Sequence, residues 1–115
     1  MSTITIYHNP RCTKSRQTLA LLQEQGVEPE VIEYLNTPLD ADALRAVVAK
    51  LGVSAQDIVR VKEAEYAEAG LSSDSSEEAV IEALVQYPKL MERPIVVSGD
   101  NAVIGRPPEN VLGLL

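Results

Sequence analysis

The sequence predicts an α/β domain built on a mixed sheet of four strands. A strand–helix–strand pattern fills roughly the first third of the chain, a helical stretch follows at about residues 38–87, and two short apolar runs lie near the end. The first pair of strands is expected to be parallel and joined by a right-handed crossover, whereas the last pair is expected to form an antiparallel hairpin. The predicted element order is therefore βαβ, a helical insertion, then ββα, all within one domain spanning residues 1–115.

The first βαβ unit follows from alternation and chain-breaking residues. Residues 3–7 (T-I-T-I-Y) alternate in apolar character, which predicts a strand that Asn9-Pro10 ends. A helix is predicted from Thr13, with Gly26 directly after its last turn. Residues 30–35 (E-V-I-E-Y-L) are expected to form the second strand.

The insertion opens with a helix whose start and end are both marked. Thr37 is the expected N-cap and Pro38 the first helical residue, and Gly52 closes the helix. An apolar stripe at helical spacing comprises Leu44, Val47, Val48 and Leu51.

The rest of the insertion is expected to be helical in shorter pieces. Shorter helices are predicted at 54–59 and 62–69. Ser75 and Glu78 have the spacing of a capping box, which predicts a helix that Pro88 ends.

The C-terminal part is expected to complete the sheet. Residues 95–97 (I-V-V) and 102–104 (A-V-I) flank the turn residues 99–101, which predicts a hairpin. Pro107 and Pro108 then open a final short helix.

Composition limits the possible functions. The chain has 115 residues, 45% of them hydrophobic, and a formal net charge of −7, which disfavours a general nucleic-acid role. No apolar run approaches the roughly 20 residues of a membrane span, and the start M-S-T-I-T-I-Y lacks a basic signal-peptide region. A single cysteine cannot form an internal disulfide. We therefore expect a cytoplasmic protein that binds neither membrane nor nucleic acid.

The single cysteine, Cys12, is predicted to lie where a strand ends and a helix begins. Residues 1–23 carry Arg11, Lys14 and Arg16 and no acidic residue, a formal charge of +3, whereas the remainder carries −10. A helix N-terminus and nearby cations both lower the pKa of a thiol, and His8 is close enough in sequence to donate a hydrogen bond or charge. The alternative is that Cys12 is a buried apolar side chain without chemistry.

At this point the residues show a specific resemblance. H-N-P-x-C-x-x-S-R near the N-terminus, T-P-L-D at 37–40, E-R-P-I-V-V at 92–97 and I-G-R-P-P-E at 104–109 resemble the glutathione- and glutaredoxin-coupled arsenate reductases. The resemblance covers essentially the whole chain. It implies a thioredoxin-like three-layer fold in which Pro94 is the cis proline that precedes a strand.

The resemblance also implies roles for individual residues. Cys12 would be the nucleophile, supported by His8, and the arsenic oxyanion would be bound by five further residues: Arg60, Arg93, Arg106, Ser15 and Arg16. Such a set is physically reasonable, because a thiolate approaching a dianion at ~4 Å meets a repulsion of about 8 kcal/mol at an effective dielectric constant of ~20. Guanidinium groups can offset this repulsion and match an oxyanion with their fork of donors.

The lack of a second cysteine points to an external reductant. Thioredoxin-coupled arsenate reductases use additional cysteines of their own, so glutathione is expected as co-substrate and glutaredoxin as partner, with no bound cofactor and no metal. Two alternatives remain. One is a redox-independent binding module resembling transcription regulators of this fold, in which Ser15 stands where a second cysteine would be. The other is a glutathione-linked thiol reductase of another substrate.

Overall fold

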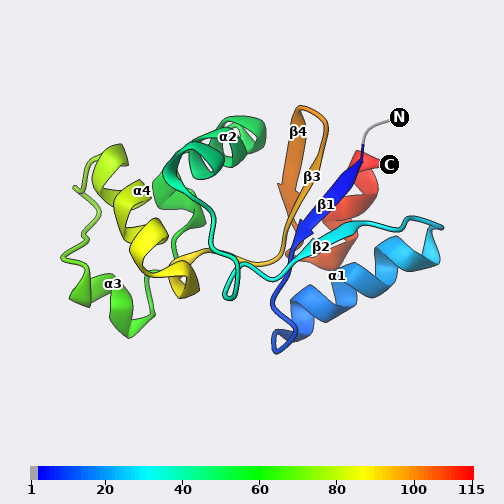
Figure 1. Ribbon diagram of the computed structural model, residues 1–115, viewed down its shortest axis with the longest axis horizontal. Coiled ribbons are helices and arrows are strands. Elements are labelled where there is room, and N and C mark those ends of the chain that lie inside the picture. The colour runs from blue at the N-terminus through cyan, green and yellow to red at the C-terminus, as the bar shows by residue number, and fades with distance from the viewer. Residues whose placement is uncertain (1–2) are drawn as a thin grey trace. The chain divides into compact units, whose positions relative to one another are not determined.

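The computed structural model describes residues 3–115 and divides the chain into two compact units. The sheet unit consists of the chain up to Thr37 together with Arg93–Leu115. The helical unit consists of Pro38–Glu92 and contains no strand of the sheet (Figure 1). The helical insertion that the sequence places at about 38–87 lies inside this second unit, which continues to Glu92.

The sheet unit contains the mixed four-stranded sheet that the sequence predicts. Its strands are β1 (Ile4–Tyr7), β2 (Glu30–Ile32), β3 (Ile95–Ser98) and β4 (Asn101–Ile104). They lie in the order β2-β1-β3-β4; β1 pairs parallel with β2 and antiparallel with β3, and β3 pairs antiparallel with β4. The parallel first pair and the C-terminal hairpin are therefore both confirmed.

One row of paired residues crosses the whole sheet at one edge. Tyr7 at the end of β1 pairs with Ile32 at the end of β2 and with Ile95 at the start of β3, which pairs with Ile104 at the end of β4. Every chain segment attached to this row therefore leaves the sheet at the same edge. These segments are 8–12, 33–36, 93–94 and 105–106.

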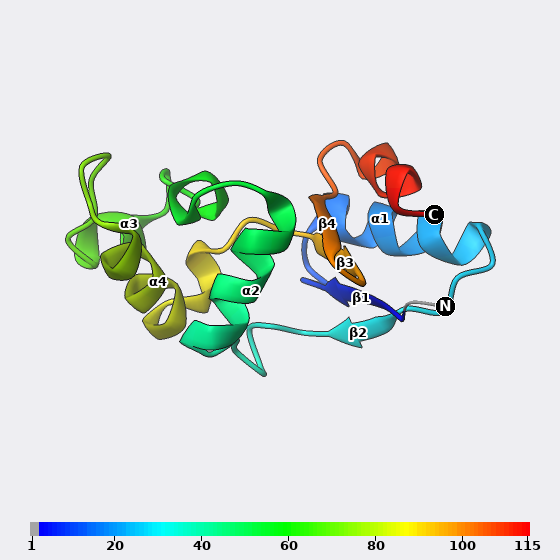
Figure 2. The same ribbon diagram turned by 90° about the horizontal axis from the view of Figure 1, so that it is seen from above.

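The core of the sheet unit lies between one face of the sheet and two helical elements. The helix α1 (Thr13–Glu24) and the 3₁₀ helix η3 (Pro108–Leu114) both pack on that face (Figure 2). The fully buried residues of this core are Ile6, Leu22, Val96 and Val111. This unit alone thus accounts for two of the three predicted layers.

The helical unit has a separate apolar core. It contains α2 (Ala41–Leu51), η1 (Ala55–Ile58), α3 (Ala64–Glu68), α4 (Glu77–Gln86) and η2 (Pro88–Leu90). The stripe predicted on the first helix contributes its buried residues Leu44, Val47 and Val48, and α2 packs against α4. Within residues 3–115, no helix combines the length and apolar character that crossing a membrane requires.

The second strand is shorter than the sequence predicts. It ends at Ile32 rather than at residue 35, because the chain turns immediately afterwards. The backbone N–H groups of Asn36 and Thr37 both donate to the carbonyl oxygen of Glu33, at 2.9 and 3.0 Å. The turn diverts the chain from the sheet before Leu35.

Two helix caps also differ from the prediction. Asp40, not Thr37, caps α2, and its Oδ1 accepts from the Ala43 N–H at 2.8 Å. Ser76, not Ser75, caps α4. Ser75 instead accepts from the Ser72 N–H at 2.9 Å and holds the preceding turn. In both cases another residue whose side chain can cap a helix lies within three positions of the observed cap.

A close approach at Gly105 fixes the packing of α1 on the end of β4. A Cβ atom at this position would lie 2.6 Å from Oγ1 of Thr18 and 2.8 Å from Cγ of Pro94. The Thr18 hydroxyl lies 2.8 Å from the Lys14 carbonyl oxygen and 3.3 Å from that of Gly105, and the Gly105 N–H donates to the Pro94 carbonyl oxygen at 2.9 Å. No side chain fits between these groups unless they separate.

We expect Gly105→Ala to destabilise the protein by about 1–3 kcal/mol, the usual range for overpacking a filled core. Gly113→Ala is the matched control, because a Cβ there meets no atom within 4 Å. The free energy of unfolding from urea titrations measures both. Equal stability of the two variants would contradict this account of the packing.

Candidate active site

Cys12 is the N-cap residue of α1 and lies on the edge where the strands end. Its backbone is extended (φ −94°, ψ 123°), and its residue surface is only 9% exposed. Its N–H donates to the Asn9 carbonyl oxygen at 3.0 Å, while the Asn9 side chain accepts from the Arg11 N–H at 3.0 Å. The sulfur therefore lies on a tightly turned loop directly before the helix.

The surroundings of Cys12 favour the thiolate. Burial is the largest single influence and by itself raises the pKa of the thiol. The backbone N–H of Ser15, the charge of Arg93, the N–H of Lys14 and the charge of Arg106 together outweigh burial and hold the pKa below its ordinary value. The two N–H groups act without closing a formal side-chain cap. The stabilising charges come from Arg93 and Arg106, which are remote in sequence, rather than from the cations adjacent to Cys12.

Arg93 and Arg106 are coupled to each other as well as to the sulfur. Nε of Arg106 donates to the Arg93 carbonyl oxygen at 2.7 Å, and its Nη2 lies 3.5 Å from Sγ of Cys12. Nε of Arg93 is buried and has no hydrogen-bond partner within residues 3–115. A buried donor without a partner is unusual, and an oxyanion beside the sulfur could satisfy it.

Each of these two arginines is followed by a proline, and both Arg–Pro peptide bonds are cis. The Arg93–Pro94 peptide bond is cis, as the resemblance implies for Pro94. The Arg106–Pro107 bond is also cis, and no feature of the sequence predicts this. Pro94 itself is buried beneath the hairpin, next to Gly105.

His8 contacts Ser15 rather than the sulfur. Nδ1 of His8 lies 2.6 Å from the Ser15 hydroxyl, which also accepts from the Asn9 N–H at 3.0 Å. Burial is the main influence that lowers the pKa of His8; Glu33 opposes it and Arg16 adds to it. The lowered pKa favours the neutral ring, and the contact with Ser15, whose N–H faces Cys12, indicates an orienting role for His8.

The two remaining predicted residues lie differently. The Arg16 guanidinium donates to the Pro10 carbonyl oxygen and to Oγ1 of Thr13, both at 3.3 Å, and so stabilises the loop around Cys12. Arg60 belongs to the helical unit, where it pairs with Glu63 and donates to the Lys89 carbonyl oxygen at 3.2 Å. The oxyanion-binding roles suggested for both stay predictions.

The geometry brings together a cysteine thiol with a lowered pKa, two backbone N–H groups and two guanidinium groups. Within residues 3–115, no group of three or more His, Cys, Asp or Glu side chains is placed to hold a metal ion. A model of the ArsC family matches residues 7–114. The chain belongs to the ArsC family. The motif around Cys12 and the two Arg-Pro pairs thus lie in the matched region.

Individual relatives of this ArsC-family chain cover nearly its full length. The protein YfgD of Escherichia coli K12 is 58% identical over 97% of this chain and 96% of its own. A protein of Neisseria meningitidis serogroup A named arsenate reductase is 44% identical, with both chains covered completely. The structure of an arsenate reductase from Vibrio cholerae matches with a TM-score of 0.95 at 46% identity, covering 99% of this chain and 98% of the other. The predicted thioredoxin-like fold is therefore confirmed.

We expect the rate of Cys12 alkylation by iodoacetamide to rise with pH around a midpoint below the ordinary thiol value of about 8.5. Arg106→Gln should move this midpoint upward, because it removes a positive charge that favours the thiolate. Lys14→Gln is the control, since only the backbone N–H of Lys14 acts on the sulfur, and it should leave the midpoint nearly unchanged. Equal shifts in both variants would show that general charge, not this geometry, sets the pKa.

Proposed function

We propose that this chain is an arsenate reductase in which Cys12 is the nucleophile and glutathione with glutaredoxin supplies the electrons. One observation carries the proposal above the others. Nη2 of Arg106 lies 3.5 Å from Sγ of Cys12, which places a guanidinium donor beside a thiol whose pKa is lowered by its surroundings. An anion that approaches this sulfur would meet positive charge and hydrogen-bond donors at once.

The first step forms a sulfur–arsenic bond. The Cys12 thiolate attacks HAsO₄²⁻, one arsenic–oxygen bond breaks, and the departing hydroxide takes up a solvent proton and leaves as water. The arsenic group binds a second solvent proton. The product is an enzyme-S–AsO₃H⁻ adduct in which arsenic is still in the +5 state. Arg106 and the unpartnered Nε of Arg93 are the donors that would offset the repulsion between the two anions.

The second step needs a thiol from outside, because the chain contains one cysteine. The thiol of glutathione attacks Sγ of Cys12 and the sulfur–arsenic bond breaks. The products are an enzyme–glutathione disulfide and H₂AsO₃⁻. Each sulfur loses one electron and arsenic gains two, passing from +5 to +3. Glutaredoxin with a second glutathione then exchanges the disulfide, which frees Cys12 and gives glutathione disulfide. This chemistry assigns the protein to the glutathione-containing cytoplasm.

The remaining residues take supporting roles in this proposal. His8 and Ser15 orient the N–H group that faces the sulfur, and Arg16 stabilises the loop. Arg60 is proposed as a third oxyanion ligand on the resemblance alone, and this role requires it to exchange its partner Glu63 for the anion.

Purified protein with glutathione, glutaredoxin, glutathione reductase and NADPH should consume NADPH when arsenate is added. Cys12→Ser should abolish this turnover, and Arg93→Ala or Arg106→Ala should lower kcat about 100-fold, the usual effect of removing one oxyanion donor. Arg45→Ala is the control, because Arg45 is a surface residue paired with Asp42 and Glu78, and it should keep wild-type turnover.

The outcomes separate the proposal from its rivals. Folded wild-type protein without arsenate-dependent turnover would contradict it and favour a binding module. Turnover of glutathione-mixed disulfides without arsenate turnover would indicate a thiol reductase of another substrate. Turnover with thioredoxin but not with glutathione would overturn the assigned reductant.

A further inference from the structure

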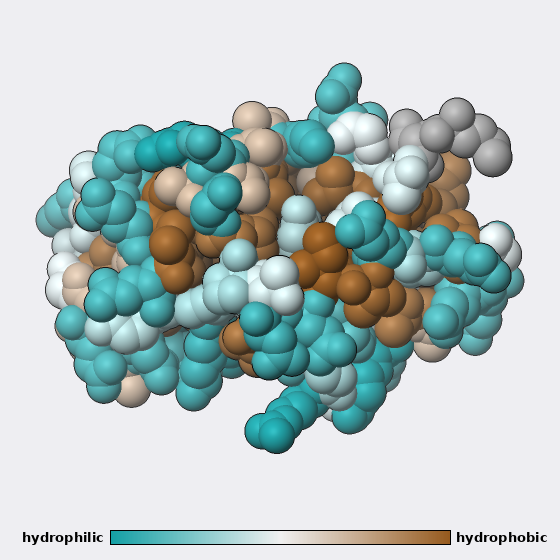
Figure 3. Space-filling model, viewed as in Figure 1, coloured by the Kyte–Doolittle hydropathy of each residue, from teal (hydrophilic) through white to brown (hydrophobic). Residues whose placement is uncertain are grey.

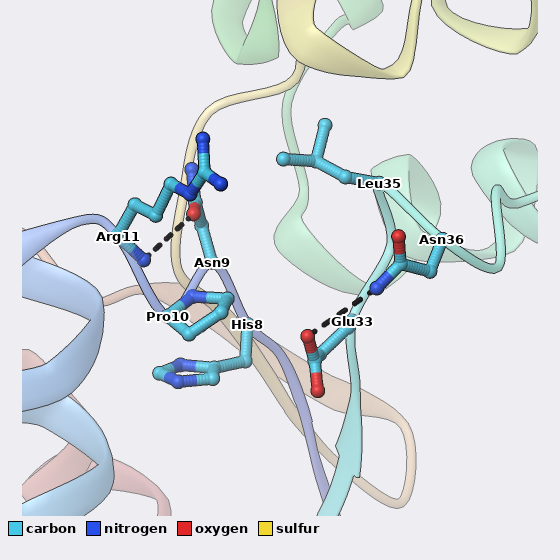
Figure 4. Close-up of a pocket in the computed structure, with 7 residues that line it drawn as sticks. All are labelled: His8, Asn9, Pro10, Arg11, Glu33, Leu35 and Asn36. Atoms are coloured by element: carbon cyan, nitrogen blue, oxygen red, sulfur yellow. Dashed lines mark hydrogen bonds between the residues drawn. The ribbon is translucent and has the colours of Figure 1, made fainter.

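A pocket lies beside the Cys12 loop at the same sheet edge. Its volume is about 410 Å³, within the range of small-molecule sites. One wall is the loop between β1 and Cys12, and the other is the turn after β2 (Figure 4). The residues that line it are His8, Asn9, Pro10, Arg11, Glu33, Leu35 and Asn36.

The pocket carries one positive and one negative side chain. The Arg11 guanidinium makes no hydrogen bond or ion pair within residues 3–115, while its backbone N–H is held by Asn9. The Glu33 carboxylate, on the opposite wall, accepts one long hydrogen bond from the Asn36 amide at 3.4 Å. The lowered pKa of His8 favours its neutral form. The net charge of the lining is therefore close to zero, which suits a zwitterion better than a polyanion.

An apolar surface adjoins these charges. Leu35, 43% exposed, forms part of the pocket wall, and Val31 of β2 is exposed to the same extent. Brown, apolar surface is visible over β2 in Figure 3. Methylene groups of a ligand could lie against Leu35 while its charged end binds deeper in the pocket.

We propose that this pocket binds glutathione through its γ-glutamyl end, with the α-carboxylate on Arg11 and the α-ammonium on Glu33. The inference rests on the proposed function, which requires glutathione at Cys12. The γ-glutamyl group carries both charges on one carbon, so a pocket with one guanidinium and one carboxylate matches it. The methylene arm of this group lies against Leu35.

The position of the pocket fits the geometry of attack. Arg11 directly precedes Cys12, so their Cα atoms are about 3.8 Å apart across a trans peptide bond. The thiol of glutathione lies about two residue lengths, roughly 7 Å, from its γ-glutamyl charges. Cys12 does not itself line the pocket, but a tripeptide anchored at Arg11 and Glu33 is long enough to reach from the pocket to this adjacent residue.

The first test uses S-methylglutathione, which binds without reacting, and the full-length wild-type protein. Its addition should shift the backbone amide resonances of residues 8–11 (Pro10 excepted) and 33–36 in NMR spectra. Arg11→Gln and Glu33→Gln should each raise the Kd for S-methylglutathione about tenfold, the effect of losing one charge-assisted hydrogen bond. Arg45→Gln and Glu28→Gln are the matched controls; both residues lie outside the pocket, and these variants should bind as the wild type does.

The second test measures steady-state turnover. Both pocket variants should raise the KM for glutathione about tenfold and leave the KM for arsenate unchanged. Amide shifts confined to α1 and η3, or variants that bind S-methylglutathione as the wild type does, would overturn the pocket inference even if turnover is normal. Amide shifts at 8–11 and 33–36 in a protein without arsenate turnover would support the pocket and contradict only the proposed function.

Discussion

The row of paired residues that crosses the sheet, from Ile32 through Tyr7 and Ile95 to Ile104, is the constraint on which the site depends. Because β1 is parallel to β2 and antiparallel to β3, the ends of β1, β2 and β4 and the start of β3 all face the same edge. Segments more than 80 residues apart in sequence thus converge on Cys12. A shift of register by one residue would turn every side chain of the strand to the opposite face and separate these segments.

The burial of the Cys12 sulfur is a second constraint on the groups at this edge of the sheet. Burial opposes a negative charge, so the pKa of Cys12 is lowered only because backbone N–H groups and two guanidinium groups outweigh the loss of water. Those groups must be rigid, since a mobile arginine would be hydrated instead. The Arg93 carbonyl oxygen holds Arg106, and the contact of Thr18 with Gly105 holds the strand end against α1. The close packing at Gly105 and the lowered pKa of Cys12 therefore depend on the same strand ends.

Much of this fold follows from local sequence signals, and the misses have physical causes. Alternation predicts β1, and two apolar runs on either side of the turn residues 99–101 predict β3 and β4. Cys12 is correctly placed at the start of α1. The predicted length of β2 is wrong because a turn closed by the Glu33 carbonyl oxygen overrides the β-propensity of Tyr34 and Leu35. The caps were misassigned because neighbouring Ser, Thr and Asp residues compete for the same donors, and only the tertiary contacts decide between them.

The site was predicted less completely than the fold. Charge near Cys12 in the sequence indicates only Arg11, Lys14 and Arg16, whereas Arg93 and Arg106 are named by the family resemblance. Strand pairing brings these two arginines, which lie just outside β3 and β4, to the sulfur. The steric need for Gly105 is likewise invisible without Thr18 and Pro94 beside it. The charged pair Arg11 and Glu33 went unnoticed for the same reason, because the two residues belong to different strand ends.

The overall charge of the molecule shows why local donors have to do the binding. With a net charge of −7, the chain as a whole would repel the anionic substrate and the anionic glutathione of the proposed reaction. Screening limits this repulsion to about 8 Å at physiological ionic strength, so it is weak for a ligand that has reached the strand edge. Within that distance the guanidinium groups of Arg93 and Arg106 and the N–H groups of α1 dominate. In the proposed reaction, the acidic surface would therefore slow capture of an anion without preventing its binding, and the geometry of the donors around the sulfur would set the selectivity among anions.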